Sequence, residues 1–333
     1  MTSSTSSRPH RLVVTPRDIE ILRSLCDVRY LTAQALEWLH WPSWRGRWAA
    51  WHHHHAAHSN ETKEYLPSTR VYTRLSQLAN ADLITRIYRP ITLAVKKFGR
   101  DADLYALTRQ GADLLVEAGR APDDIVVDDG RLRSSQTLAH SADVGRVYAA
   151  LRACIEDRAA DGLSMTDWQG DHHTARAYDR VDTTIQQANG TRRKVTLPVQ
   201  PDGTFTLMYP GGSLRCFVEV DRGRHIRTWR EKIHAYRAYR HSPQLQARYG
   251  VATFALLTVT NVPGQRTKLM QATAQILGRP SDYYLFTLIS EAHPTRIGQW
   301  LKITEVPTYT TSSGRFGASP PQIAIKTDVH YFL

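Results

Sequence analysis

The stretch that most constrains the fold of this chain is residues 201–221. Gly211-Gly212 is a turn signal between two runs rich in apolar residues, and this pattern predicts a β-hairpin. Residues 216–220 are almost all apolar, which is typical of a strand buried on both faces. We therefore expect the hairpin to form the centre of a mixed sheet.

Three acidic residues stand at the ends of the hairpin strands: Asp202, Glu219 and Asp221. Burying a carboxylate costs several kcal/mol unless a cation or a hydrogen-bond donor compensates it. Hard divalent ions prefer oxygen ligands. The three acids therefore predict a Mg²⁺ or Mn²⁺ site at the strand ends.

The charge of the chain favours a polyanionic partner. The chain has 43 Lys and Arg against 31 Asp and Glu, a net charge of +12, and nucleic acid fits this excess better than a membrane surface does. No apolar run is long enough to span a membrane, and we read residues 1–14 as a disordered tail. The three cysteines form neither a disulfide framework nor a zinc spacing, so we expect a cytoplasmic protein.

Residues 15–120 predict a winged helix-turn-helix domain. Helices begin near Thr15, Leu31 and Pro67, and a strand, a basic loop, a second strand and a last helix follow. Such a domain places its third helix in the major groove of double-stranded DNA and its wing on the backbone. The alternative is a winged helix used only for protein contacts. The predicted DNA contacts are Arg70, Thr73, Arg74, Gln77, Lys96, Lys97 and Arg100.

A segment rich in Trp and His, residues 41–66, interrupts this domain. Its tryptophans recur at helical spacing, at Trp41, Trp44, Trp48 and Trp51. The consecutive histidines that follow point in different directions along a chain, so we do not favour a metal site there. Four exposed indoles would form a patch that monomers rarely tolerate. We expect them to pack on the domain or across the two-fold axis of a homodimer.

Residues 121–136 have the composition of a linker, and residues 137–292 predict a second domain of mixed α+β or α/β class. Its predicted order is α, β, β, β, α, β, α, β, although residues 161–200 are too polar to assign beyond one strand at their start. The helix at about 226–241 carries many Arg residues between aromatic ones. Residues 293–333 are expected to form an extension over the domain.

The second domain resembles the PD-(D/E)xK nuclease fold, an αβββαβ core with acids at the ends of its central hairpin. Pro201-Asp202 matches the first motif, and Glu219-Val220-Asp221 matches the second except that Asp221 stands where lysine is usual. Residues 15–290 together resemble the replication-relaxation family of plasmid and mobile-element proteins in actinobacteria. The motifs that carry this resemblance are Thr15-Pro16-Arg17-Asp18-Ile19-x-Ile21-Leu22, Arg74-Leu75-x-x-Leu78, Tyr105-Ala106-Leu107-Thr108-x-x-Gly111, Pro201-Asp202-Gly203, Glu219-Val220-Asp221-Arg222-Gly223 and Lys232-x-x-x-Tyr236.

The nuclease resemblance implies that Asp202, Glu219 and the Val220 carbonyl hold the divalent ion. Asp221 would be an added ligand, and Lys232 would supply the missing cation if its helix folds back over the strand ends. Further candidates for the cation are Arg222 and Arg224, and further candidates for the metal shell are Asp143 and Glu156, although solvent exposure is the simpler interpretation of Glu156.

Three hypotheses follow. The first is a metal-dependent DNA endonuclease or nickase targeted by the winged helix. The second is a nuclease fold without activity, serving as a DNA-binding scaffold or a regulator of transcription or replication, with other mobile-element proteins as partners. In the third, Arg222 and Arg224 compensate the acids structurally and the protein is a protein-binding module.

Overall fold

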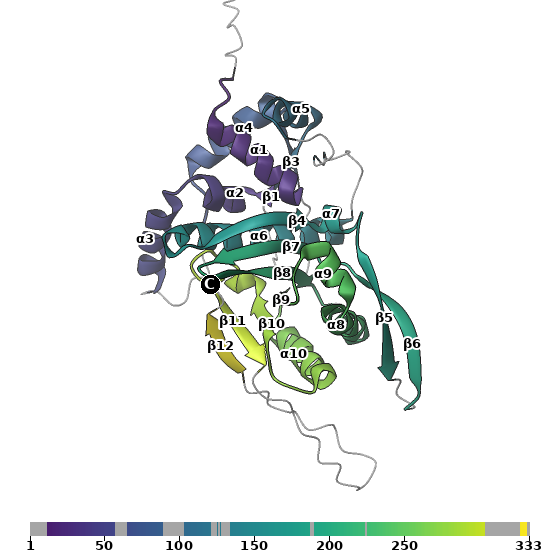
Figure 1. Ribbon diagram of the computed structural model, residues 1–333. Helices are drawn as coiled ribbons and strands as arrows, with labels where there is room; N and C mark the ends of the chain where they lie inside the picture. Colours follow the sequence, from purple (N-terminus) through teal and green to yellow (C-terminus); the bar gives the residue numbers. More distant parts are fainter. Residues whose placement is uncertain are drawn as a thin grey trace, which may run out of the picture. The chain divides into compact units, whose positions relative to one another are not determined.

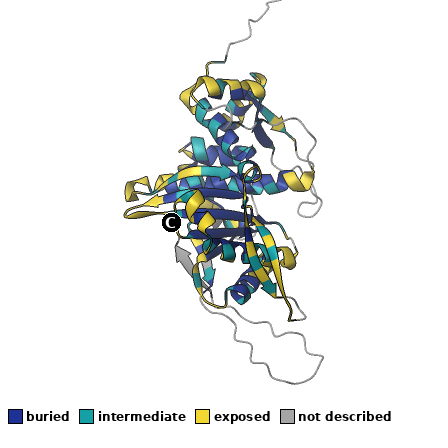
Figure 2. Ribbon diagram, turned by 45° about the vertical axis from the view of Figure 1, so that its right-hand side comes forward, coloured by how far each residue is buried: buried dark blue, intermediate teal, exposed yellow. Residues whose placement is uncertain are grey.

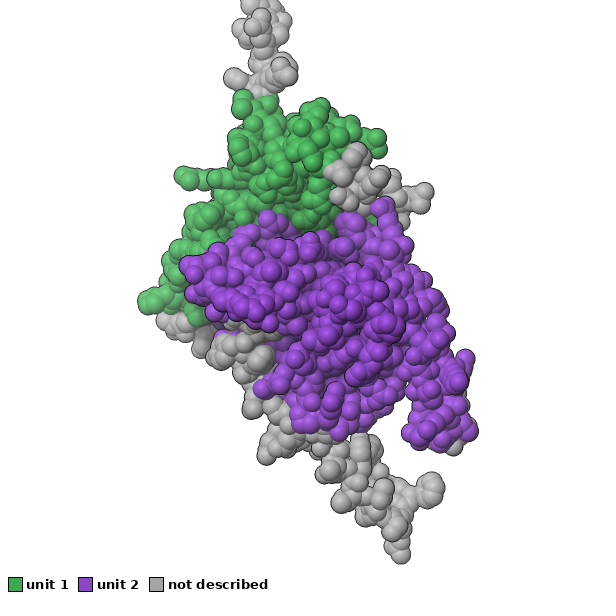
Figure 3. All heavy atoms as spheres, viewed as in Figure 1, with its two compact units in different colours: residues 1–138 green, residues 139–333 purple. Residues whose placement is uncertain are grey.

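The computed structural model describes residues 12–56, 65–88, 103–120, 125, 127, 134–186, 190–223, 225–303 and 327–331. The chain divides into two compact units, unit 1 at residues 1–138 and unit 2 at residues 139–333 (Figures 1 and 3). Both contain helices and strands, so the fold is of mixed α and β class, as expected. No helix in the described ranges is long and apolar enough to cross a membrane.

Unit 1 consists of helices around a small antiparallel sheet with strand order β1-β3-β2 (Figure 1). The helices and strands follow the predicted order with two additions. A two-residue strand, β1, precedes the second helix, and helix α3 forms within the Trp/His-rich segment. Their bounds are α1 Pro16–Val28, β1 Leu31–Thr32, α2 Ala33–His40, α3 Trp44–Ala56, α4 Thr69–Asn80, β2 Ile84–Ile87, β3 Leu104–Leu107 and α5 Arg109–Glu117.

A buried ion pair joins the start of α1 to α4. The Asp18 side chain accepts hydrogen bonds from the backbone and hydroxyl of Thr15, the capping arrangement that begins α1. Arg74 donates from Nε to Asp18 Oδ1 over 2.8 Å and contacts Oδ2 through its Nη2. Burial alone would raise the pKa of the Asp18 carboxyl, but the bonds from Arg74 and Thr15 bring that pKa below its ordinary value.

Helix α3, in the Trp/His-rich segment, packs within unit 1. Arg47 of α3 binds the fully buried Glu37 of α2, and Glu37 also accepts the backbone amide of Ser68, just before α4, over 3.0 Å. A buried acid is tolerated only with such partners. Hence α3 supplies a cation on which α2 and the start of α4 depend.

The tryptophans of this segment pack within the unit. Trp44 is fully buried, and its indole donates to the Trp38 carbonyl over 3.1 Å. Trp48 and Trp51 stack with ring centroids 5.2 Å apart, and both meet Tyr65 edge-on. The packing that we expected against the domain is therefore present, although the helix begins at Trp44 and not at the first tryptophan of the stripe.

Unit 2 is built on a mixed seven-stranded sheet with order β12-β11-β10-β9-β8-β7-β4, and a separate two-stranded hairpin, β5–β6, lies beside it (Figure 1). Its helices of two turns or more and its strands are α6 Ser135–Asp157, β4 Ser164–Gly170, β5 Asp179–Gln186, β6 Arg192–Val199, β7 Gly203–Tyr209, β8 Gly212–Asp221, α8 Ile226–Arg240, α9 Pro243–Tyr249, β9 Phe254–Thr260, α10 Pro263–Leu277, β10 Ser281–Leu288, β11 Gln299–Ile303 and β12 Thr327–Tyr331. Four-residue α7, Asp171–Thr174, follows β4.

The predicted hairpin lies inside this sheet as β7–β8, one strand away from its centre. β8 pairs antiparallel with β7 and parallel with β9, and the strands of this region are largely buried (Figure 2). Phe217 belongs to the apolar cluster that α8, α9 and α10 form on one face. On the other face, Tyr148 of α6 meets Trp168, which stacks on Phe205 of β7. The two helical layers explain why β8 is apolar on both faces.

Two parts of unit 2 differ from expectation. Residues 161–200, left mostly unassigned from sequence, hold β4 and the β5–β6 hairpin, whose residues alternate between exposed and more buried (Figure 2). Strands covered on one face only carry many polar residues, which weakened the sequence signal. The described part of residues 293–333 also differs, because β11 and β12 continue the sheet beyond β10.

We expect Arg74→Ala to lower the free energy of unfolding by about 3–5 kcal/mol, because it leaves the buried Asp18 carboxylate without its cation. The Asp18 pKa is depressed in the fold, so the loss should be present above pH 3.8, the ordinary pKa, and shrink as the pH falls below it. Denaturant unfolding at several pH values measures both effects.

The matched control is Arg23→Ala, which removes an exposed ion pair to Glu20 and should cost about 1 kcal/mol or less. An equal decrease in the free energy of unfolding in the two variants would show that the Arg74–Asp18 pair does not stabilise unit 1 more than an exposed ion pair does.

Candidate functional site

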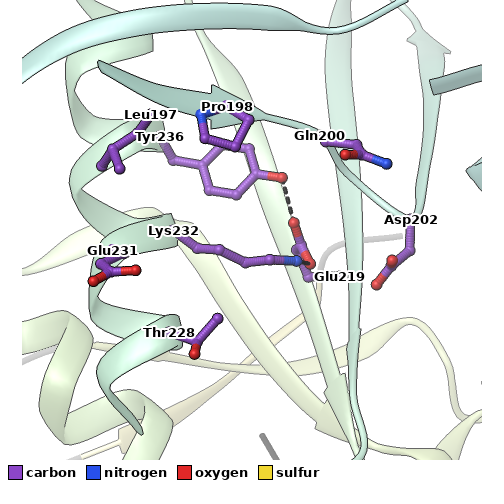
Figure 4. A pocket seen from close by; sticks show the side chains of 9 residues that line it. All are labelled: Leu197, Pro198, Gln200, Asp202, Glu219, Thr228, Glu231, Lys232 and Tyr236. Carbon is purple, nitrogen blue, oxygen red and sulfur yellow. Dashed lines mark hydrogen bonds and ion pairs between the residues drawn. The ribbon is translucent and has the colours of Figure 1, made fainter. Parts of the chain in front are cut away.

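Asp202 and Glu219 line one pocket of about 320 Å³, and their carboxylates turn toward the same space (Figure 4). The Asp202 amide donates to the Val218 carbonyl over 2.9 Å, and Asp202 Oδ2 accepts the Val220 amide over 2.8 Å. Since these two valines flank Glu219 in β8, the two bonds place the Asp202 carboxylate beside Glu219. The hairpin itself thus sets the position of both acids.

Helix α8 supplies two donors to Glu219 (Figure 4). Lys232 Nζ donates to Glu219 Oε2, and the Tyr236 hydroxyl donates to Oε1. Residues four apart lie on one face of a helix, so α8 presents both groups to β8 together. Glu219 is 2% exposed, whereas the Lys232 side chain is 22% exposed and reaches the pocket from its open side. The helix after the hairpin therefore folds back over the strand ends, as a role for Lys232 requires.

The two carboxyls of the pocket have pKa values displaced in opposite directions. Burial raises the pKa of Glu219, and Lys232 opposes the rise without cancelling it. Burial would also raise the pKa of Asp202, but the charge of Lys232 and the hydrogen bonds from His140 and the Val220 amide lower it well below its ordinary value. Two acids that share one cation do not ionise independently. The negative charge of the pocket therefore resides first on Asp202.

Asp221 does not line this pocket. It lies two residues beyond Glu219 on the same strand, and its Oδ2 accepts Gln265 Nε2 over 2.9 Å and the Gly223 amide over 3.3 Å. Gln265 belongs to the first turn of α10. The structure brings Asp202, Glu219 and Lys232 together and leaves Asp221 at the strand end, beside α10.

The other candidates have partners elsewhere or lie outside the described part of the chain. Arg222 forms an ion pair with Asp143 of α6, so that charge compensates Asp143 and not the pocket acids. The Glu156 side chain is 49% exposed and pairs with Arg152, which agrees with the simpler interpretation of that residue. Arg224 lies outside the described residues.

The donor set of the pocket suits a hard divalent ion. Among the described residues, no group of three or more His, Cys, Asp or Glu forms a metal cluster. Mg²⁺, however, commonly binds through one or two carboxylates, waters and a substrate phosphate. Asp202 and Glu219 provide two carboxylates on a pocket with room for waters, and the Val220 carbonyl is a third oxygen close by in β8. Glu219 would have to exchange Lys232 for the ion.

Sequence reasoning missed two residues that shape the site. His140 Nε2 lies 3.1 Å from Asp202 Oδ1, and no pattern in α6 indicated this contact. Tyr236 was noted only within a family motif. Its spacing of four from Lys232 placed it on the same helix face and was a usable signal.

The predicted DNA-contacting residues of unit 1 do not all share one surface. Arg70, Thr73 and Gln77 are exposed on α4. Arg74 is instead held by Asp18, by the Val13 carbonyl (2.8 Å) and by Gln77 (2.9 Å). The predicted wing residues Lys96, Lys97 and Arg100 lie outside the described residues. The surface that α4 offers to a partner is therefore narrower than expected and centred on Arg70, Thr73 and Gln77.

A family model described as replication-relaxation matches residues 22–254, a span that contains the β7–β8 hairpin and all of α8. No curated protein and no solved structure matches the chain.

We expect Lys232→Met to destabilise the protein by about 3–5 kcal/mol at neutral pH, because the buried Glu219 loses its cation. Because the pKa of Glu219 is raised, ionising this carboxyl destabilises the fold, and more so without Lys232. The loss of stability should therefore be small below pH 4.5, the ordinary Glu pKa, and grow as the pH rises. Unfolding midpoints measured between pH 4 and 8 test this.

In the double variant Glu219→Gln/Lys232→Met, the part of this growth with pH that comes from Glu219 should disappear, and only the part that comes from Asp202, the second acid near Lys232, should remain. Lys302→Met, which removes the cation paired with the exposed Asp282, serves as the control. A pH-independent loss in the single variant would contradict the pairing.

Proposed function

The chain belongs to the replication-relaxation family, and from this premise we propose that it is a divalent-metal-dependent DNA endonuclease that nicks the DNA of a plasmid or mobile element. The observation that carries the proposal is the meeting of Asp202, Glu219 and Lys232 at one pocket. Two acids and a lysine are the groups that phosphodiester hydrolysis by a PD-(D/E)xK nuclease requires. Here the lysine comes from α8 and not from β8.

The connectivity of unit 2 supports this proposal. The order α6, β4, β7, β8, α8, β9 follows the αβββαβ core of that nuclease fold, with the β5–β6 hairpin inserted after β4. β4, β7 and β8 pair antiparallel in turn, and β9 returns parallel to β8 through the α8 crossover. Both acids stand where β7 and β8 meet, as the fold resemblance implies.

Unit 1 supports a role in recognition of double-stranded DNA. Its helices α1, α2 and α4 and its β1-β3-β2 sheet follow the order of a winged helix, in which α4 would be the recognition helix. Arg70 can donate to base edges or phosphates, and Thr73 and Gln77 offer both donors and acceptors. All three side chains are exposed on α4.

In this proposal the side chains of the pocket have distinct roles. Asp202 and Glu219 would hold Mg²⁺ or Mn²⁺, which when bound supplies charge stabilisation at the scissile phosphate and a water of lowered pKa. Tyr236 fixes Glu219 through Oε1 and leaves its other oxygen to a cation. Lys232, released from Glu219, donates to the phosphate oxygen that gains negative charge. Asp221, through Gln265, orients the end of β8 and stays a candidate for an outer ligand.

The reaction is a hydrolysis and needs no other reactant. The oxygen of a water bonds to phosphorus, and the bond from phosphorus to one deoxyribose oxygen breaks. The leaving oxygen takes up a proton to balance the one that the water gives up. His140 contacts Asp202 and would influence the protonation of that acid.

A second candidate function is a nuclease fold that binds DNA without cutting it, as a scaffold or regulator that acts with other proteins of the mobile element. Asp221 in the usual lysine position favours this alternative, as does the direct contact between Lys232 and Glu219, which satisfies both groups without a metal. The two functions differ in whether the purified protein cleaves DNA.

The test of the endonuclease is nicking of supercoiled plasmid DNA with Mg²⁺ or Mn²⁺, with chelator as control. We expect Asp202→Asn and Glu219→Gln to abolish nicking and to leave DNA affinity unchanged or slightly raised, since each removes charge that repels phosphate. Lys232→Ala should slow nicking by about 10²-fold or more, the scale expected when a group that stabilises transition-state charge is lost.

Wild-type cleavage that survives both acid substitutions would remove this pocket from the reaction. No wild-type cleavage with either metal, alone or with the other proteins of the element, together with retained DNA binding, would establish the second candidate function.

Recognition is tested separately with Arg70→Ala and Gln77→Ala. Each should weaken binding to a selected target site by about 1–3 kcal/mol and weaken binding to random duplex less, because base contacts carry the discrimination. Arg74 is kept intact, since its loss would destabilise unit 1 through Asp18. Tyr72→Phe, an exposed change on the same helix, is the control, and unchanged selectivity in both Ala variants would exclude α4 from the interface.

A further inference from the structure

A groove of about 1700 Å³ runs between the β5–β6 hairpin and helices α8 and α10. The hairpin packs against α8 through Val181 and Val199, which belong to the apolar cluster of unit 2. Its far end stands off from the body of the unit, with a gap between the two (Figure 3). The groove therefore has one wall from the hairpin and one from the helices.

Both walls of the groove are basic. The hairpin wall carries Arg192, Arg193 and Lys194, all of them exposed. On β6, Arg193 shares one strand face with Val195, Leu197 and the buried Val199, the face that is turned to α8. Arg192 and Lys194 belong to the other strand face and also line the groove. Among the described residues that line the groove, Glu231 is the one acid against six Lys and Arg.

The helix wall is a stripe of basic residues on α8. Arg227, Arg230, His234 and Arg237 follow one another at i, i+3, i+7 and i+10, the spacing of a single helix face. Arg230 contacts Gln275, and Arg237 donates to the Ile276 carbonyl over 2.7 Å. Both acceptors are neutral groups of α10, so they hold these guanidinium groups on the helix wall without cancelling their charge. Arg227 differs, because it pairs with Glu231 over 3.4 Å.

The groove joins the pocket of the two acids. Leu197 and Glu231 line both, and opposite edges of α8 face the two spaces, Arg230 and His234 toward the groove and Lys232 toward the pocket. A chain lying along the groove would therefore pass within reach of Asp202 and Glu219.

The composition of the lining indicates which part of a nucleic acid it would contact. Single-strand binding sites stack bases on aromatic side chains, and none of the described residues that line the groove is Phe, Tyr or Trp. Lys and Arg without aromatic residues are suited to phosphate oxygens. Burial, with Arg237 and Arg230 nearby, also lowers the pKa of His234, as expected where positive charge is uncompensated.

We propose that this groove binds the phosphate backbone of duplex DNA, independently of base sequence, and leads one strand to the Asp202–Glu219 pocket. The inference deepens the proposed function by giving the catalytic unit its own DNA-binding surface, and it rests on that function for the role of the pocket. An acidic protein segment is the other polyanion that could occupy the groove.

The experiment compares two charge-matched double variants of the full chain. Arg193→Gln/Lys194→Gln removes one Arg and one Lys from the groove, and Arg176→Gln/Lys268→Gln removes one of each from exposed positions outside it. Affinity for a random duplex is measured against salt concentration in chelator, so that no cleavage takes place. Circular dichroism checks that both variants are folded.

We expect the groove variant to weaken binding and to reduce the slope of log K against log salt by about 0.9 for each lost phosphate contact, hence by about 1.8 if both are lost. The control variant should keep the wild-type slope. Arg193→Lys should also keep it, because a backbone contact needs charge and not the shape of a guanidinium group.

Equal slopes and affinities in the groove and control variants would overturn the inference, and the groove would then be free for an acidic protein. This outcome is distinct from failure of the endonuclease. If groove variants lose duplex binding although wild type never nicks DNA, the groove assignment stands without catalysis. If nicking depends on Asp202 but no step depends on Arg193 or Lys194, catalysis stands without the groove.

Discussion

The contact of Glu219 with Lys232 and Tyr236 is the interaction on which the arrangement of unit 2 depends. Glu219 lies on a strand with apolar layers on both faces, where an unpaired carboxylate would be strongly destabilising. Its two partners are on α8, so α8 has to cross β8 at this point. That crossing forms the pocket on one edge of the helix and turns its basic stripe toward the β5–β6 hairpin. The position of one acid thus sets both the candidate catalytic site and the candidate DNA path.

Unit 1 contains two further buried acids that are paired in the same way. Asp18 is compensated by Arg74, and Glu37 by Arg47, each cation coming from an element later in the chain than the acid. Such pairs contribute little net stability, but the loss of one partner is costly, so they specify which elements meet. The pair in unit 2 differs in that a second acid, Asp202, shares its cation and an open pocket adjoins it. The second acid and the open pocket are therefore the two features that distinguish the candidate site of unit 2 from the structural ion pairs of unit 1.

The sequence predicted the structure well where burial gives the apolar residues a clear periodic spacing. The β7–β8 hairpin, the α8 helix and the order of elements in unit 1 were predicted because turn residues and apolar spacing agreed. The β5–β6 hairpin was missed because one face of it is exposed and charged, so its apolar residues show no clear periodic spacing.

Side-chain pairing was also hard to predict. Arg74 has the polar spacing of a DNA contact, yet Asp18, 56 residues earlier, binds it. His140 was not predicted at all, since a contact across 62 residues leaves no local pattern. Only the fold decides which charges meet.

The central claim is that Asp202 and Glu219 share a divalent ion once Lys232 moves to the substrate. The test is a crystal structure with Mn²⁺ and a duplex oligonucleotide, in which the anomalous signal locates the manganese. The crystallised protein keeps Lys232 and carries a substitution meant to slow cleavage, such as Tyr236→Phe. The account predicts an ion at about 2.1 Å from an oxygen of each carboxylate, with Lys232 Nζ on a phosphate oxygen. An intact Lys232–Glu219 contact with no anomalous peak between the two acids, at saturating Mn²⁺ and with DNA bound, would contradict it.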